Sequence, residues 1–134
     1  SVDEQLEDIV QNASGTTITM PADLVGFYLS SELTDDEDWH GIHNGGTTAA
    51  STTTTDVDLN DDAVAGEWQV LRLEVASDGT TTWWIDGVLK QTVTAACSTT
   101  TNLAAVLACG ANTTELVIMD VDYMLVEANR DWTV

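Results

Sequence analysis

Apolar and polar residues alternate along three short runs in the second half of the chain, and turn residues separate the runs. Alternation with a period of two sends apolar side chains to one face of a strand and polar ones to the other. The first run shows it most clearly, because Leu71, Leu73 and Val75 alternate with two charged residues. We therefore predict three antiparallel strands joined as a meander. Their expected ranges are 68–76, 80–85 and 88–94.

The turn after the first run decides which tryptophan is buried. A two-residue turn would pair Leu73 with Trp84. A three-residue turn, in which Gly79 takes the left-handed conformation of a bulge, would pair Leu73 with Trp83 instead. The second register gathers the large apolar residues on one face. We therefore predict the three-residue turn, with Trp83 in the core and Trp84 on the opposite face. A second hairpin turn is expected at Asp86-Gly87.

Further strand candidates lie on both sides of this meander, after a short helix predicted over 1–10. Roughly eight short strands separated by turn residues are typical of a β-sandwich or barrel. No helical crossovers are visible, which argues against a parallel α/β sheet. We predict an all-β, antiparallel β-sandwich that occupies residues 1–134 as one domain. The additional strand candidates are 16–20, 25–29, 39–43, 47–57, 103–109 and 116–126.

The last of these runs has apolar residues on both of its faces. The outer face of a sandwich is normally polar, so we expect something to cover this strand. Cover by a local loop and cover by a neighbouring subunit both remain open, and we favour the subunit. One face carries Ile118, Asp120, Asp122, Met124 and Val126, and the other carries Met119, Val121, Tyr123 and Leu125.

Composition and charge exclude several classes of partner. The chain has 134 residues, 43% of them hydrophobic, and a formal net charge of −20. Its positive side chains are Arg72, Lys90 and Arg130, and phosphate backbones are bound mainly by such side chains. No run is long and apolar enough for a membrane span. We therefore expect neither nucleic acid nor membrane as a partner. Adaptation to salt and repulsion between many displayed copies both explain the acidity.

Cysteine and histidine do not predict a metal site. Cys97 and Cys109 lack the spacing and number of tetrahedral metal ligands. A bridge between them remains open, but we favour two isolated, buried thiols. His40 and His43 lie three residues apart on a predicted strand, which sends them to opposite faces. We expect them to be surface histidines.

One acidic stretch has the spacing of oxygen ligands in a twelve-residue calcium loop. The glycine that such a loop needs for its sharp turn is replaced by Asp61, and no flanking helices are expected. Chance matches are frequent in a chain this acidic, so we predict no metal at this stretch, although calcium binding there stays open. The candidate ligands are Asp56, Asp58, Asn60, Asp62 and Glu67.

Two runs of the chain together resemble a known family. The first is 68–88, which contains two Asp-Gly turns and ends with Asp86-Gly87-Val88, and the second is 120–126. Together they resemble a concanavalin A-like (lectin/glucanase) jelly roll, in which such strands share one sheet and a final strand often reads Asp-Tyr-Val-x-Val. This resemblance implies an N-terminal strand that pairs with the closing one. The first residues contain no convincing candidate. We therefore expect that Ser1 is not the natural start and that the strand is missing or provided by another chain.

The Thr-, Ala- and Asp-rich composition, together with the tail Asn129-Arg130-Asp131, is similar to jelly rolls in virion proteins of tailed phages. This resemblance implies a virion location and a non-enzymatic structural role, in capsid decoration or in a tail. The expected partners are capsid or tail subunits and further copies of the chain.

Jelly-roll glycosidases place closely spaced acids on one strand, because hydrolysis needs an acid and a second carboxylate. Neither Glu7-Asp8 nor the lone Glu74 keeps that spacing. We therefore predict no catalytic residue, no cofactor and no enzyme activity. The alternative function is a carbohydrate-binding module of a fibre or secreted protein. Its sugar-stacking residues would be Tyr28, Trp39 and Trp84, although Trp84 also has Arg72 as a cation–π partner.

Overall fold

The computed structural model describes residues 11–12, 15–110 and 118–128. The chain divides into two units, residues 1–103 and 104–134, and each is described by itself. The first unit contains the helix and strands assigned among the described residues, and its all-β character confirms the predicted class. The elements are β1 (Gln11–Asn12), β2 (Ile18–Thr19), β3 (Leu24–Tyr28), β4 (Asp38–Asn44), α1 (Thr54–Val57), β5 (Asp58–Asp62), β6 (Leu71–Val75), β7 (Thr81–Ile85) and β8 (Val88–Val93).

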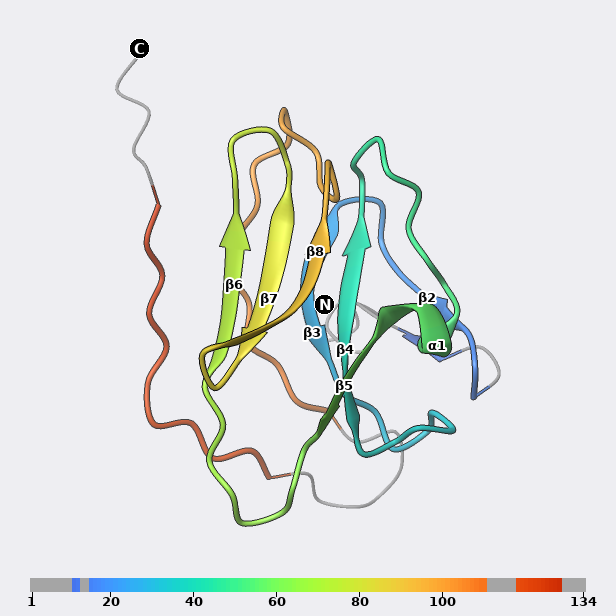
Figure 1. The fold of residues 1–134 in the computed structure, drawn as a ribbon, viewed down its shortest axis with the longest axis vertical. Helices are drawn as coiled ribbons and strands as arrows, with labels where there is room; N and C mark the ends of the chain where they lie inside the picture. Colours follow the sequence, from blue (N-terminus) through green and yellow to red (C-terminus); the bar gives the residue numbers. More distant parts are fainter. Residues whose placement is uncertain (1–10, 13–14, 111–117, 129–134) are drawn as a thin grey trace, which may run out of the picture. The chain divides into compact units, whose positions relative to one another are not determined.

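Two antiparallel, three-stranded sheets form the first unit (Figure 1). The first has the strand order β3-β4-β5 and the second β6-β7-β8, while β1 and β2 form a separate pair. In both sheets, sequence neighbours are also neighbours in space, as in a meander. The described residues contain no helix long and apolar enough to cross a membrane.

The predicted register of the β6–β7 hairpin is confirmed. Leu73 lies opposite Trp83, and Leu71 lies opposite Ile85. Gly79 has a φ of +80°, the left-handed conformation that the three-residue turn requires. The Trp83 side chain is accordingly 0% exposed. The hairpin turn expected at Asp86-Gly87 also forms, because the residues flanking it are paired.

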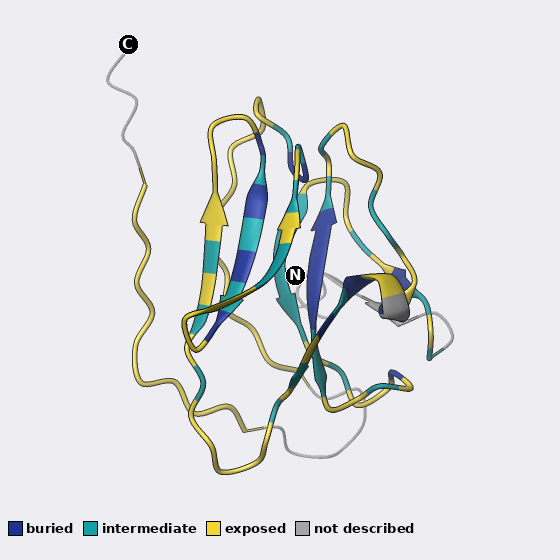
Figure 2. Ribbon diagram, in the orientation of Figure 1, coloured by how far each residue is buried: buried dark blue, intermediate teal, exposed yellow. Residues whose placement is uncertain are grey.

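The second sheet packs against one face of the first through a shared core. The central strands β4 and β7 carry most of the buried strand residues (Figure 2). A hydrogen bond joins the sheets, because the Trp83 indole Nε1 donates to the Gly26 carbonyl oxygen at 2.8 Å. The fully buried members are Leu59, Trp83, Ile85 and Ala96, with Val25, Phe27, Trp39, Leu71, Leu73 and Val93 packed around them.

The other face of the β3-β4-β5 sheet is covered by a second, smaller core. Ile18 from β2 and Val57 from α1 pack there against Ile42 of β4. Strand β4 is therefore buried on both faces. This double burial explains why neither histidine of β4 is exposed, contrary to the prediction of surface histidines.

The predicted strand 47–57 is wrong. Its last four residues form the helical turn α1, and the following residues form the unpredicted strand β5. Thr54 and Val57 are both buried, and a separation of three residues places them on one side of a helical turn. The threonine-rich run therefore forms a helical turn that buries Thr54 and Val57. β-Propensity alone does not predict this outcome.

The predicted strands 103–109 and 116–126 are not observed among the described residues. Residues 103–110 and 118–128 have no strand assignment, and all of them are exposed. A strand needs a neighbour for its backbone N–H and C=O groups, and alternation of side chains does not supply one. The helix expected over residues 1–10 lies outside the described residues.

Candidate functional site

Three aspartates from separate segments meet at one end of the β3-β4-β5 sheet. Asp35 belongs to the loop before β4, Asp38 begins β4 and Asp58 begins β5. Each offers a carboxylate oxygen, and these oxygens all lie within 4.8 Å of one another. All three side chains are half-buried. We call this group the aspartate cluster.

A buried histidine adjoins the aspartate cluster. His40 of β4 is 0% exposed, and its Nε2 lies 3.1 Å from Asp35 Oδ2. The antiparallel register also places His40 opposite Asp58. Two buried polar atoms here have no hydrogen-bond partner, namely Asp35 Oδ1 and His40 Nδ1. Asp35 is therefore partly buried, although it belongs to a run of four adjacent acids, residues 35–38.

The environment of the cluster raises the pKa of the Asp38 carboxyl from 3.8 to about 6. Desolvation is the largest cause, followed by a hydrogen bond with Asp62, and the charges of Asp58, Asp62 and Asp35 act in the same direction. A raised carboxyl pKa means that the folded protein resists the negative charge at this position.

We predict that Asp38→Asn stabilises the fold at neutral pH. Because the folded pKa lies above the unfolded one, the folded state binds the proton more tightly. The Asp38 carboxyl therefore makes its full contribution to stability below pH 3.8. This contribution falls as the pH rises and is lost above about pH 6. After allowance for solvent screening, the variant should gain about 1 kcal/mol at neutral pH and almost nothing at about pH 4.

Urea unfolding across this pH range, with a chelator present, measures the difference between Asp38→Asn and the original chain. Asp36→Asn is the matched control, because Asp36 is exposed and the same charge is removed. An equal gain in both variants would mean that general charge repulsion, rather than the cluster, causes the effect.

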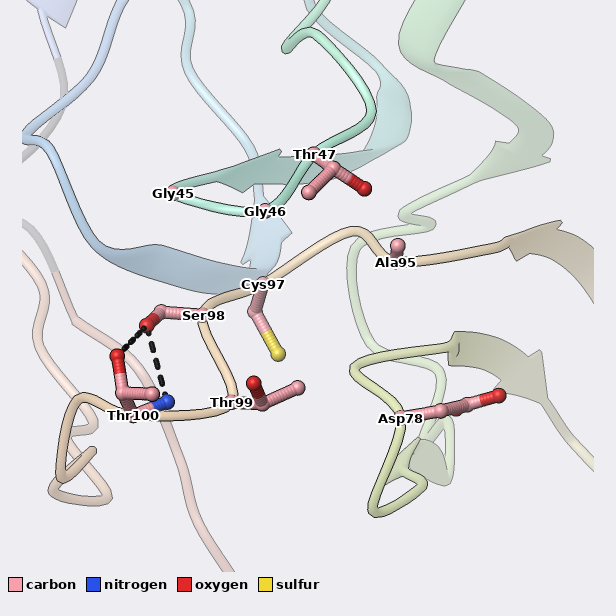
Figure 3. A pocket seen from close by; sticks show the side chains of 9 residues that line it. All are labelled: Gly45, Gly46, Thr47, Asp78, Ala95, Cys97, Ser98, Thr99 and Thr100. Atoms are coloured by element: carbon pink, nitrogen blue, oxygen red, sulfur yellow. Dashed lines mark hydrogen bonds between the residues drawn. The ribbon is translucent and has the colours of Figure 1, made fainter.

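The cluster does not line the cavity found in the first unit. That cavity has a volume of about 370 Å³ and lies beside Gly45 and Gly46, which follow the end of β4, whereas Asp38 is at its beginning (Figure 3). Asp78 is the one carboxylate among the lining residues, so the cavity holds no acid pair of the kind that glycoside hydrolysis requires. The cavity is lined by Gly45, Gly46, Thr47, Asp78, Ala95, Cys97, Ser98, Thr99 and Thr100.

Polar contacts within and beside the cavity come mainly from backbone groups and short hydroxyl side chains. Ser98 Oγ lies 3.2 Å from Thr100 Oγ1. Hydrogen bonds from Thr80 hold the pKa of the Asp78 carboxyl below its usual range. Cys97 is buried as expected, but Cys109 is exposed, so the prediction of two buried thiols is wrong for Cys109.

The three candidate sugar-stacking aromatics lie at three different places. Tyr28 packs against the smaller core. Trp39 lies edge-to-face against Phe27, with ring centroids 6.2 Å apart. Trp84 is half-buried on β7, and the Arg72 guanidinium lies 5.5 Å from its ring centroid. The fold therefore gathers no aromatic platform from these residues.

The candidate calcium loop is not a loop. Its residues form α1, β5 and part of the following connection. Asp58 Oδ1 accepts a hydrogen bond from the backbone of Asn60, and Asp56 accepts one from Ser51. Only Asp58 of the proposed ligands joins the aspartate cluster. The sequence did contain a signal for the cluster, since the acidic run 35–38 directly precedes the strand with the buried histidine.

No protein-family model matches this chain, and neither a curated protein nor a solved structure shows significant similarity to it. Inference about function therefore depends on the chain's own residues.

Proposed function

We propose that this chain is a non-enzymatic structural protein of a virus particle, a jelly-roll domain used in capsid decoration or in a tail. It would act by contacts with capsid or tail subunits and with its own copies. The two antiparallel sheets and the β6–β7 register are compatible with a concanavalin A-like jelly roll. The virion role itself draws on the resemblance in residues 68–126 and the similarity to phage virion domains.

An exposed apolar segment carries the proposal of protein contacts. Residues 118–126, which we call the closing segment, contain seven large apolar side chains that are exposed. Exposed apolar groups gathered in one segment are typical of surfaces that bind another protein. The exposed fractions are 73% for Ile118, 40% for Met119, 47% for Val121, 68% for Tyr123, 52% for Met124, 70% for Leu125 and 61% for Val126.

The backbone of the closing segment favours the same conclusion. Its described residues belong to no sheet, so their N–H and C=O groups can pair with the edge of another sheet. When a strand is added to the edge of a sheet, main-chain hydrogen bonds provide affinity, and pockets for alternate side chains provide specificity. A segment that is apolar on both faces would gain most when covered on both.

The charge of the chain sets the conditions for contacts between copies. At a net charge of −20, two copies repel each other over a distance that depends on salt. The screening length falls from about 10 Å at 0.1 M salt to about 3 Å at 1 M salt. Self-association should therefore strengthen as salt rises, whereas contacts driven by opposite charges weaken.

We predict that Val126→Asp weakens self-association about tenfold, which corresponds to about 1.4 kcal/mol. A buried carboxylate in an apolar contact must be desolvated without a partner. Sedimentation velocity of the full chain over a range of concentrations, in about 0.5 M NaCl, measures the association. Val64→Asp is the matched control, because Val64 is similarly exposed at 49% but lies in the connection between β5 and β6.

Two results would contradict the self-association part of the proposal. One is a chain that stays monomeric at every concentration and salt. The other is an equal loss of association in Val126→Asp and Val64→Asp, because the closing segment would then have no special role.

A carbohydrate-binding module is the alternative function, and Trp84 is the observation in its favour. This residue is half-buried on the face of β7 opposite the core, and its indole Nε1 donates to Thr82 Oγ1 at 3.1 Å. The nearby Arg72 competes with a sugar for the same ring. Glycan-array binding that Trp84→Ala abolishes would favour the module over the structural protein.

A further inference from the structure

We propose that Asp35, Asp38 and Asp58 bind a hard divalent cation, for which Ca²⁺ is the best match. This proposal goes beyond the structural role proposed above and does not depend on it. The site lies where the loop before β4 meets the first residues of β4 and β5.

The spacing of the carboxylates fits a single ion. One oxygen from each aspartate lies within 4.8 Å of the oxygens of the other two. Carboxylate oxygens this close together can bind one hard cation. Ca²⁺ accepts irregular arrangements of carboxylates, whereas Mg²⁺ demands near-ideal octahedral geometry and usually keeps several waters. We therefore expect Ca²⁺ rather than Mg²⁺ on three carboxylates from separate segments.

His40 provides an independent indication of a ligand. Its side chain is completely buried, its Nε2 is directed at Asp35 Oδ2, and its Nδ1 has no partner. The second oxygen of the same carboxylate, Asp35 Oδ1, is also buried without a partner. Buried polar atoms are nearly always satisfied by a partner. A cation held by Asp35 Oδ1 would satisfy that oxygen, while His40 fixes the orientation of the carboxylate through the other oxygen.

The electrostatics of the cluster favour the same conclusion. Positive side chains are scarce in this chain, and the ion pair of Lys90 joins Asp61 rather than the cluster. The three clustered carboxylates therefore repel one another, since one oxygen of each lies within 4.8 Å of the other two. A divalent cation held between them would replace this repulsion with attraction.

The expected affinity is modest. Three protein oxygens leave the remaining positions of a six- to eight-coordinate ion to water and backbone groups. Sites of low ligand number in extracellular modules bind Ca²⁺ with Kd values of about 10⁻⁴ to 10⁻³ M. We expect the Kd in this range.

Calorimetric titration and thermal unfolding of the full chain with Ca²⁺ test the proposal. We expect one saturable site per chain and a rise in Tm of about 5 °C at about 10 mM CaCl₂, relative to NaCl of equal ionic strength. Asp58→Asn should abolish both, while its amide oxygen can still accept the hydrogen bond from Asn60. Asp36→Asn removes the same charge from an exposed position and should leave both unchanged.

Asp35→Asn provides a second variant if Asp58→Asn does not fold, because its amide oxygen can still accept a hydrogen bond from His40. Non-saturable binding, or an equal loss in the Asp36 and Asp58 variants, would overturn the proposal by showing that Ca²⁺ only screens the acidic surface. A Tm rise with Mg²⁺ equal to that with Ca²⁺ would overturn the choice of ion.

Discussion

Trp83→Ala should lower the free energy of unfolding by about 4 kcal/mol, the largest loss that we expect from a single side chain. The indole is completely buried between the two sheets, where it packs with Leu59 and Ile85. Its removal leaves a cavity lined by side chains of both sheets. It also leaves the Gly26 carbonyl oxygen without the indole donor that joins the sheets.

Trp84→Ala is the matched control for this prediction. The same chemical change on the neighbouring residue removes a half-buried ring whose contacts are Arg72 and Thr82. The loss there should be about 1 kcal/mol, the value of an exposed cation–π pair. Urea unfolding followed by circular dichroism measures both. Equal losses, or a larger loss for Trp84→Ala, would show that the β6–β7 register is one residue out.

Gly46→Ala should destabilise the fold by about 3 kcal/mol, the second largest effect that we expect. A Cβ atom on Gly46 would overlap the carbonyl oxygen of Ala95 and the backbone of Ala96. Ala96 is itself completely buried in the core between the sheets, so this backbone has little freedom to move away. Gly46 does not have a positive φ, so the destabilisation would come from steric overlap and not from backbone strain.

Gly26→Ala is the control for Gly46→Ala. No atom lies within 4 Å of the Cβ position at Gly26, which also lacks a positive φ. This variant should be unchanged within about 0.5 kcal/mol. Thermal and urea unfolding of the two variants give the comparison. A stable Gly46→Ala would mean that the loop containing Ala95 and Ala96 does not pack against the end of β4.

The meander is the part of the fold that could be predicted best, because its signals are local. Alternation fixed the faces of β6, and a glycine able to adopt positive φ fixed the turn before β7. The error over residues 47–57 has the opposite cause. A run of threonines suits a strand by propensity, yet the core residues that pack with Val57, such as Ile18 and Ile42, come from distant segments.

The candidate site was much harder to predict. Its three aspartates are separated by up to 23 residues in sequence. The pattern of the acidic run 35–38 predicts exposure to solvent, unless a buried group is known to lie beside it. His40 is that group, and its burial results from packing on both faces of β4. The spacing of oxygen ligands at 56–67 suggested a calcium loop, but these residues form α1, β5 and part of the following connection. Regular spacing in the sequence therefore did not bring these side chains together.

The amino-acid sequence alone determined the all-β class, the hairpin register that buries Trp83 and the net charge of −20. These depend on side-chain period, turn chemistry and charge number, which are properties of neighbouring residues or of the whole composition. Tertiary structure alone decided which acids meet, that both histidines are buried and which apolar segment is exposed. Those outcomes depend on long-range strand pairing, because only packing between distant segments removes a side chain from water or leaves it there.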